Sequence, residues 1–228
     1  MNTIMIFWRR KPRVEALLPK IGVSELLPEE ISVKIQEADT KDGNVSFGEL
    51  VLIAQLVKLR KPSRIFEIGT FDGRTTLNLA INSGDGAQIF TLDLEAGEKA
   101  ETSAGGDKKF MGKVETGYRF KKRLESSKII QLLGDSAKFN FANFHNSIDF
   151  VFIDGSHAYE YIKKDSETAF EITKPRLPDG QAGATILWHD YNTSWPGVTE
   201  ALNELYQSDP RFKNLHHITG TSLVILRI

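Results

Sequence analysis

Short apolar segments alternate with amphipathic ones along most of the chain, and this alternation constrains the fold more than any other feature. The strand-like segments lie at 64–69, 88–94, 128–135, 150–154 and 184–190, with two more within 215–228. The helix-like segments lie at 46–62, 73–83, 157–173 and 197–207. Strands that are apolar throughout are buried on both faces, which is typical of parallel sheets. The sequence therefore predicts a doubly wound α/β domain with a mostly parallel seven-stranded sheet, helices on both faces and an antiparallel C-terminal strand.

The first 44 residues do not share this alternation. Prolines 12, 19 and 28 divide them into short pieces, and only 27–38 has a helix-like composition. Ser46 and Glu49 have the spacing of a capping box, so that a long helix is expected to begin there. We therefore expect two parts: an N-terminal appendage of short helices (1–44), which could mediate a homodimer, and one domain over 45–228.

Composition excludes several classes of protein. Because none of the 228 residues is cysteine, disulfides and thiolate metal sites are excluded. The net charge of −1 gives no overall field for nucleic acid or a membrane surface. The apolar N-terminal stub precedes the basic residues, which is the reverse of a signal peptide, and no apolar run is long enough to cross a bilayer. We expect a cytoplasmic protein that binds neither nucleic acid nor membranes.

A glycine turn joins the first predicted strand to its helix. Glu67 ends the strand, and Gly69, Thr70, Phe71 and Gly73 form the turn. A dinucleotide site would carry the pattern Gly-x-Gly-x-x-Gly, with pyrophosphate on the helix N-terminus. This turn lacks that pattern, and its acid would repel pyrophosphate but would suit a cationic ligand. A turn that only packs the helix on the sheet is the alternative.

Two further strand ends carry acids beside the turn. Asp93, followed by Leu94, ends the second strand, where an acid can accept both ribose hydroxyls of a nucleoside. Gly134, Asp135 and Ser136 follow the third strand. Asp135 could accept a hydrogen bond from a ligand there, although an Asp-Ser pair is equally a helix cap.

The strongest signal comes from the next two strand ends. Asp154 ends one apolar strand and His157 follows it, while His189 and Asp190 end the following strand. Because neighbouring parallel strands end at one edge of a sheet, these side chains are expected to meet there. Carboxylates and imidazoles at one edge form a ligand set for a divalent ion.

The motifs Glu-x-Gly-x-x-x-Gly, "IDGSH" and "HD" together resemble class I S-adenosylmethionine-dependent methyltransferases over about 44–206. The chain is similar to bacterial metal-dependent O-methyltransferases of the catechol, caffeoyl-CoA and macrolide or sugar type, which have a Rossmann-like sheet. The donor-binding positions that the resemblance implies are Glu67, Gly69, Thr70, Phe71, Gly73, Asp93, Leu94, Gly134, Asp135, Ser136 and Asp154.

The resemblance also implies a reaction centre. Asp154, His189 and Asp190 correspond to metal ligands, and the expected ion is Mg²⁺ or Mn²⁺. His157 stands where the family commonly has a lysine that acts as general base, with Asp154 beside it as the second catalytic residue. Histidine is tolerable there because its pKa suits proton transfer near neutral pH. His189 departs from the oxygen ligands that Mg²⁺ prefers.

The expected function is methyl transfer from S-adenosylmethionine to a hydroxyl of a small molecule. Three alternatives stay open: a metal-dependent hydrolase, an NAD-dependent oxidoreductase, and a donor-binding protein without catalysis. The long polar connection 95–127 is expected to cover the acceptor. Its basic residues, among them Arg119, are interpreted as one face of a solvated amphipathic helix. Trp188 is expected in the core, and Trp195 at the acceptor.

Overall fold

A computed structural model describes residues 14–41, 43–95, 107, 115–175 and 183–228. The strands are β1 (Lys20–Ile21), β2 (Arg64–Ile68), β3 (Gln88–Asp93), β4 (Ile129–Leu133), β5 (Phe150–Ile153), β6 (Thr185–Trp188), β7 (His216–Ile218) and β8 (Val224–Arg227). The α-helices are α1 (Val23–Leu26), α2 (Phe47–Arg60), α3 (Arg74–Asn82), α4 (Tyr159–Ile172) and α5 (Pro196–Ser208). Short 3₁₀ helices are η2 (Leu124–Lys128), η3 (Ala142–Phe144) and η4 (Pro210–Phe212). No helix of this described part is long and apolar enough to cross a bilayer.

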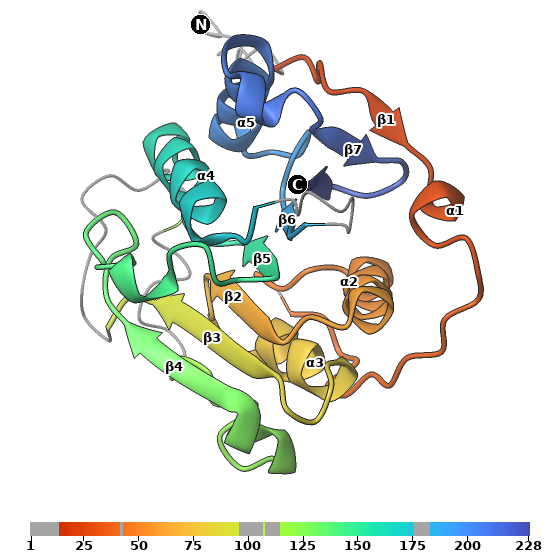
Figure 1. Cartoon of the computed structure of the whole chain (residues 1–228), viewed down its shortest axis with the longest axis vertical. Coiled ribbons are helices and arrows are strands. Elements are labelled where there is room, and N and C mark those ends of the chain that lie inside the picture. The colour runs from red at the N-terminus through yellow and green to blue at the C-terminus, as the bar shows by residue number, and fades with distance from the viewer. Residues whose placement is uncertain (1–13, 42, 96–106, 108–114, 176–182) are drawn as a thin grey trace, which may run out of the picture.

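The strands form one sheet in the order β1-β7-β8-β6-β5-β2-β3-β4 (Figure 1). All neighbouring pairs are parallel except those of β8, which runs antiparallel to β6 and β7. The predicted architecture is confirmed, but the described residues contribute eight strands instead of seven. The additional strand is β1, which comes from within the first 44 residues and has only two residues. A strand this short leaves no recognisable pattern in a sequence.

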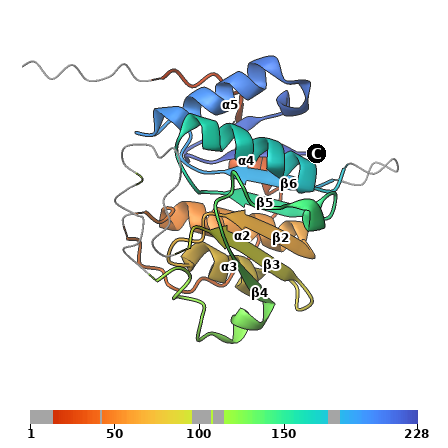
Figure 2. The ribbon, with the colours of Figure 1, turned by 90° about the vertical axis from the view of Figure 1, so that its left-hand side faces the viewer.

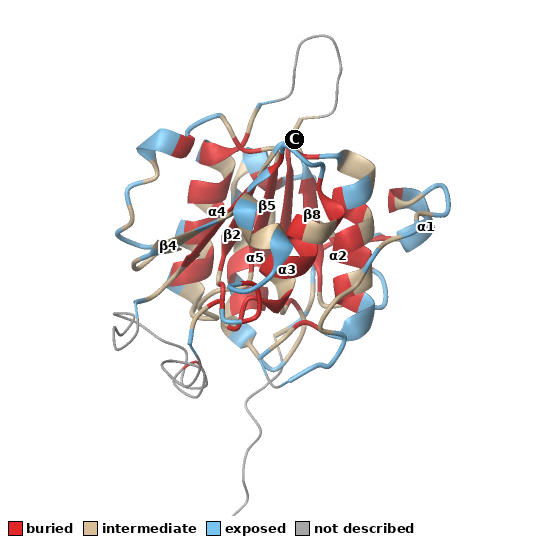
Figure 3. Ribbon diagram, turned by 90° about the horizontal axis from the view of Figure 1, so that it is seen from below, coloured by how far each residue is buried: buried red, intermediate tan, exposed pale blue. Residues whose placement is uncertain are grey.

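Helices cover both faces of the sheet (Figure 2). On one face, α2 and α3 pack on a core that includes Ile65 and Phe152. On the other, α4 and α5 pack on a core that includes Phe66, Ile153 and Trp188. Burial is therefore concentrated along the strands and on the helix faces turned to them (Figure 3). As predicted, Trp188 is a core residue.

The predicted helix at 27–38 is wrong, because that segment has no regular secondary structure. We call residues 27–41 the strap, because they run past α2 and α3 (Figure 1). Side chains of the helices bind its main chain: Asn82 bonds both the N–H and the C=O of Lys34. Asn78 does the same at Gln36. These bonds use peptide groups that a helix would need for itself.

Part of the long basic connection lies on the glycine turn. The N–H of Gly117 donates to the C=O of Phe71, and the N–H of Arg119 donates to that of Asp72. Arg119 is buried and pairs with the carboxylates of Asp72 and Glu37. The interpretation of this residue as part of a solvated helix is wrong, because two buried or half-buried acids compensate its charge. The expected cover over the acceptor falls largely on 96–106 and 108–114, which lie outside the described residues.

Candidate functional site

The candidate site lies at the edge of the sheet where β2, β3, β5 and β6 end. Strands β2 and β5 are neighbours, and the chain proceeds outward from them in opposite directions. Ligands of open parallel sheets bind beyond the carboxyl ends of the strands at such a switch point. Glu67, Asp93, Asp154, His189 and Asp190 lie at or directly after the ends of these four strands. The structure thus places the acids and the histidine pair predicted from the sequence at one edge.

The glycine turn packs tightly against the end of β5. Gly69 has a φ of 101°, and a Cβ there would lie 2.1 Å from the main-chain oxygen of Asp154. Gly73, with a φ of 85°, is the N-cap of α3, and a Cβ would lie 2.6 Å from the ring of Phe120. Larger side chains at either position would push the turn away from its neighbours. Thr70 and Phe71 complete the turn, and the Thr70 hydroxyl lies 2.6 Å from that of Thr91.

Glu67 is completely buried beneath this turn. Its Oε2 accepts hydrogen bonds from the hydroxyls of Thr76, on α3, and Thr91, on β3. Its Oε1 has no hydrogen-bond partner among the described residues. Burial raises the pKa of Glu67 to about 8, and the two hydroxyl bonds offset this only in part. A cationic partner at Oε1 would favour the ionised form of this buried group.

Asp93 connects the end of β3 to the glycine turn. Its Oδ2 accepts from the N–H of Phe71 at 2.7 Å, and its Oδ1 accepts from the N–H of Leu94 at 2.7 Å. Burial raises the pKa of Asp93, while these amide bonds act in the opposite direction.

The third strand end is organised around Asp135. Gly134, at a φ of 148°, leads from β4 into a turn in which Asp135 Oδ1 accepts from the N–H of Ala137 at 3.0 Å. Oδ2 of the same carboxylate accepts from the hydroxyl of Tyr161 at 2.9 Å. Asp135 therefore caps a turn and not a helix, because residues 136–138 form a turn. Ser136, the next residue, lies near the buried carboxylate of Asp165, on α4.

Beyond β5 and β6, histidines and carboxylates form one cluster. Nδ1 of His189 lies 3.0 Å from Asp154 Oδ1 and 3.2 Å from Asp190 Oδ2. Its Nε2 lies 3.4 Å from Glu49 Oε2. His157 joins the cluster through Nε2, which lies 2.8 Å from Asp190 Oδ2. The four residues named from the sequence are thus in mutual contact, directly or through Asp190.

Mutual compensation sets the protonation of this cluster. Burial acts to lower the pKa of His157, but its bonds to Asp107 and Asp190 raise it to about 9. Burial also acts to lower the pKa of His189. The charge of Asp154 and the bonds to the surrounding carboxylates nevertheless raise it well above its usual value. Burial acts to raise the pKa of Asp190, but its two histidine partners lower it overall. Each histidine is therefore a cation among acids at neutral pH.

Sequence reasoning missed two acids of the cluster. Glu49 forms the predicted capping box with Ser46, but it also accepts from the N–H and hydroxyl of Ser222 and contacts His189. Asp107 lies 2.6 Å from Nδ1 of His157. Glu49 and His189 are 140 positions apart in the sequence, and Asp107 and His157 are 50 positions apart. No local sequence pattern predicts either contact. Trp195, expected at the acceptor, stacks on the ring of His157.

The cluster also has a donor set suited to a divalent cation. Asp154, His157 and Asp190 each offer a ligand atom, and these atoms lie within 4.8 Å of one another. His189, which the sequence named as a ligand, lies between the same two carboxylates. Two carboxylates with an imidazole favour Mn²⁺ and later transition metals over Mg²⁺.

Comparison with known proteins shows which family the chain resembles. Residues 66–191, more than half of the chain, match the family described as a methyltransferase domain. The chain belongs to this methyltransferase family. The match begins within β2 and ends just after Asp190, so it spans the glycine turn and every member of the histidine–carboxylate cluster except Glu49. The resemblance drawn from the motifs is confirmed. No curated protein matches the chain.

Solved methyltransferase structures share the fold. The O-methyltransferase TomG from Streptomyces achromogenes, in complex with SAM, is 19% identical, with a TM-score of 0.57 over 89% of this chain and 92% of its own. The SAH-bound methyltransferase PaMTH1 from Podospora anserina is 18% identical, with a TM-score of 0.57 over 82% and 80%. The O-methyltransferase from Bacillus cereus in complex with SAH is 17% identical, with a TM-score of 0.50 over 85% and 83%. At these identities the likeness concerns the fold.

Proposed function

We propose that this methyltransferase moves a methyl group from S-adenosylmethionine to a hydroxyl oxygen of a small molecule. The observation that carries the proposal is the convergence of a donor-type turn and a histidine–carboxylate cluster on one edge of the sheet. The turn ends at Gly73, and the main-chain oxygen of Asp154 lies directly against Gly69. Donor and acceptor would then meet between the two groups, and alignment of an in-line displacement is most of the catalytic work.

The donor's methionine end would lie at the glycine turn. Glu67 would hold the ammonium group, because its Oε1 is buried and has no hydrogen-bond partner among the described residues. Binding a cation would favour the ionised carboxylate, whose pKa burial otherwise raises to about 8. Asp93 would accept the ribose hydroxyls, and 134–136 would border the adenine. To accept the ribose hydroxyls, Asp93 would give up part of its hydrogen bonding to the amides of Phe71 and Leu94.

The acceptor hydroxyl would lie at the histidine–carboxylate cluster. Asp154 and Asp190, with the imidazole of His189 between them, fit a divalent cation, and these mixed oxygen and nitrogen donors favour Mn²⁺ over Mg²⁺. When bound, such a cation would lower the pKa of the acceptor hydroxyl and offset the carboxylate charge that holds His157 protonated. His157 would take the hydroxyl proton on Nε2, the nitrogen that faces Asp190.

The donor site is tested by calorimetric titration of S-adenosylhomocysteine into the wild type and Glu67→Gln. We expect micromolar binding by the wild type and at least tenfold weaker binding by the variant, because the substitution keeps the size of the side chain but removes its charge. Glu25→Gln, on α1 beside the far strand β1, is the matched control and should bind as the wild type does. Absence of wild-type binding, together with a melting temperature raised by NAD, would overturn the proposal in favour of an oxidoreductase.

A further inference from the structure

Three groups hold the ring of His157. Nδ1 lies 2.6 Å from Asp107 Oδ1, and Nε2 lies 2.8 Å from Asp190 Oδ2. The ring stacks on Trp195, with centroids 4.0 Å apart and planes 13° apart. The two carboxylates thus lie at opposite nitrogens of one stacked ring, and only Asp190 belongs to the proposed reaction centre.

The stacking cannot by itself select the orientation of the ring. A half-turn about the Cβ–Cγ bond keeps the plane against Trp195 but exchanges the nitrogen and carbon edges. Polar contacts at the nitrogens therefore decide which edge faces the reaction centre. Asp190 alone could bond either nitrogen after such a flip, whereas a second acceptor fixed at Nδ1 admits one orientation.

Asp107 is itself held in place. It is buried, and its Oδ2 accepts from the hydroxyl of Ser156 at 2.9 Å and from the N–H of His157 at 3.2 Å. Burial acts to raise the pKa of Asp107, but the bond from His157 and these neighbours lower it overall, so the group is an ionised acceptor. An ionised carboxylate fixed by main chain and side chain can impose an orientation on the ring that it binds.

We propose that Asp107 is a positioning residue for methyl transfer: its carboxylate binds Nδ1–H of His157 and thereby directs Nε2 toward the reaction centre. The inference rests on the proposed role of His157. Asp107 accepts no proton in this arrangement; like the acid of a serine-protease triad, it orients the imidazole. Loss of Asp107 should therefore disturb the Nε2–Asp190 contact, although Asp107 does not touch Nε2.

The test is nuclear magnetic resonance of protein labelled with ¹⁵N at its five histidines. His157→Gln assigns the two N–H resonances of His157. In Asp107→Ala we expect loss or exchange broadening of the Nε2–H resonance as well as of Nδ1–H. In Asp107→Asn, whose amide oxygen can still accept from Nδ1–H, we expect the Nε2–H resonance to be retained. An unchanged Nε2–H resonance in Asp107→Ala would overturn the proposal.

A matched control and a binding measurement distinguish a lost ring orientation from a general disturbance of the fold. Asp149→Asn changes an aspartate that likewise accepts from a serine hydroxyl and a main-chain N–H, but at the opposite edge of the sheet, and should leave both resonances in place. The variants of Asp107 should bind S-adenosylhomocysteine within twofold of the wild type, which shows that the fold and the donor site are intact. If the wild type fails to bind it, the proposed function fails; if binding is normal and Nε2–H persists in Asp107→Ala, only the positioning role fails.

Discussion

At the scale of single residues, the partners of each buried acid decide its protonation. Glu67 and Glu49 are both buried glutamates. Two hydroxyls bind Glu67, and its pKa rises to about 8 because burial outweighs them. Burial also acts to raise the pKa of Glu49, but a histidine partner and the bonds from Ser222 lower it overall. The site therefore contains one glutamate that burial keeps protonated at neutral pH and another that its partners keep ionised.

Asp165, buried completely on α4, allows a test of this argument away from the reaction centre. Burial raises its pKa to about 7, and Ser136 offsets the shift only in part. Between about pH 4 and pH 7 the folded state keeps a proton that the unfolded state loses, so the free energy of unfolding falls as pH rises. The loss is on the order of a few kcal/mol and is complete above about pH 7.

Asp165→Asn should therefore stabilise the protein more at pH 8 than at pH 5. The neutral amide removes the cost of ionising a buried group. The raised pKa of Glu67 affects the pH dependence of the wild type and of the variant equally. Urea unfolding at the two pH values measures the difference. Glu160→Gln, exposed at the start of the same helix, is the control and should show no such pH dependence. Equal effects of Asp165→Asn at both pH values would contradict the raised pKa.

The sequence could identify Glu67, Asp93, Asp154, His189 and Asp190 because a strand end can be located from its own apolar run. Parallel strands then bring their ends to one edge without any further information. Asp107 could not be found in this way, because it lies within a polar connection with no periodicity. Its contact with His157 joins residues 50 positions apart, and no local pattern relates them.

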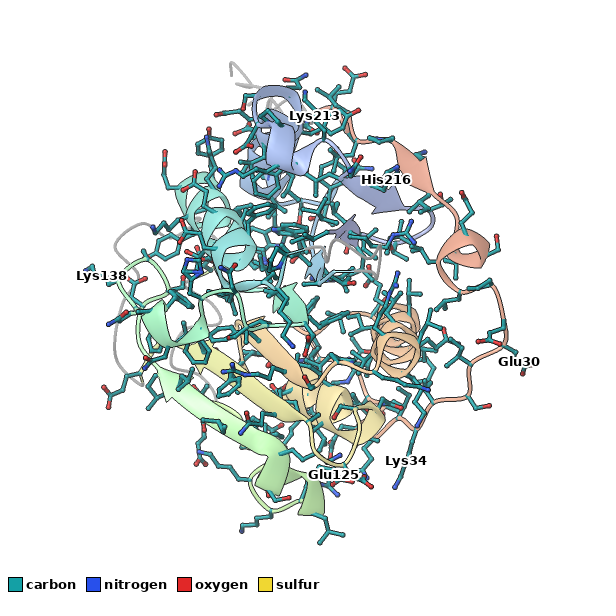
Figure 4. All side chains as sticks on the ribbon, viewed as in Figure 1. Glu30, Lys34, Glu125, Lys138, Lys213 and His216 are labelled. Atoms are coloured by element: carbon teal, nitrogen blue, oxygen red, sulfur yellow. The ribbon has the colours of Figure 1, made fainter. Side chains whose placement is uncertain are left out.

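At the scale of elements, α3 has two roles. Its N-terminus follows the glycine turn, and its side chains bind the strap (27–41). Besides the amide pairs of Asn78 and Asn82, the buried guanidinium of Arg74 donates to the main-chain oxygens of Glu37, Ala38 and Val45. Figure 4 shows the side chain of Lys34 pointing away from the protein, which agrees with binding through its main chain alone.

Replacing Asn78 and Asn82 together with alanine should release the strap. Each amide makes two bonds to one strap residue, and each lost bond to a half-buried group costs about 1 kcal/mol. Hydrogen exchange measured by mass spectrometry should show faster exchange at Lys34 and Gln36, with β2 and β5 unchanged. Asn140→Ala, which removes only an exposed turn contact, is the control. Unchanged protection of the strap would contradict the amide clamp.

Elements with strong periodicity were predictable, and the strap was not. The capping box of Ser46 and Glu49 placed the start of α2 correctly. The helix expected at 27–38 failed because propensity over a short polar segment is a weak signal that tertiary bonds override. An asparagine pair four residues apart on α3 is also typical of a solvated face, so nothing in the sequence marked it as a clamp.

At the scale of the whole molecule, residues before 45 are joined to the rest at several places. β1 pairs with β7, the strap binds α3, and the N–H groups of Leu17 and Leu18 donate to the hydroxyl of Tyr191, the neighbour of Asp190. The division at residue 44 and a dimer role for the first part stay predictions. The global fold could be predicted because alternation along the chain determines a layered parallel sheet. The place of β1 beside β7, at the end of the strand order, depends on contacts that have no sequence pattern.

Three separate segments, at the carboxyl ends of β2, β3 and β4, would bind the methyl donor in the proposed function. Hydrogen exchange with and without S-adenosylhomocysteine tests whether they do. We predict increased protection at 66–74, 93–95 and 134–137 together. The opposite, amino-terminal ends of the strands should be unchanged. Protection confined to other segments, or none at saturating ligand, would contradict the claim.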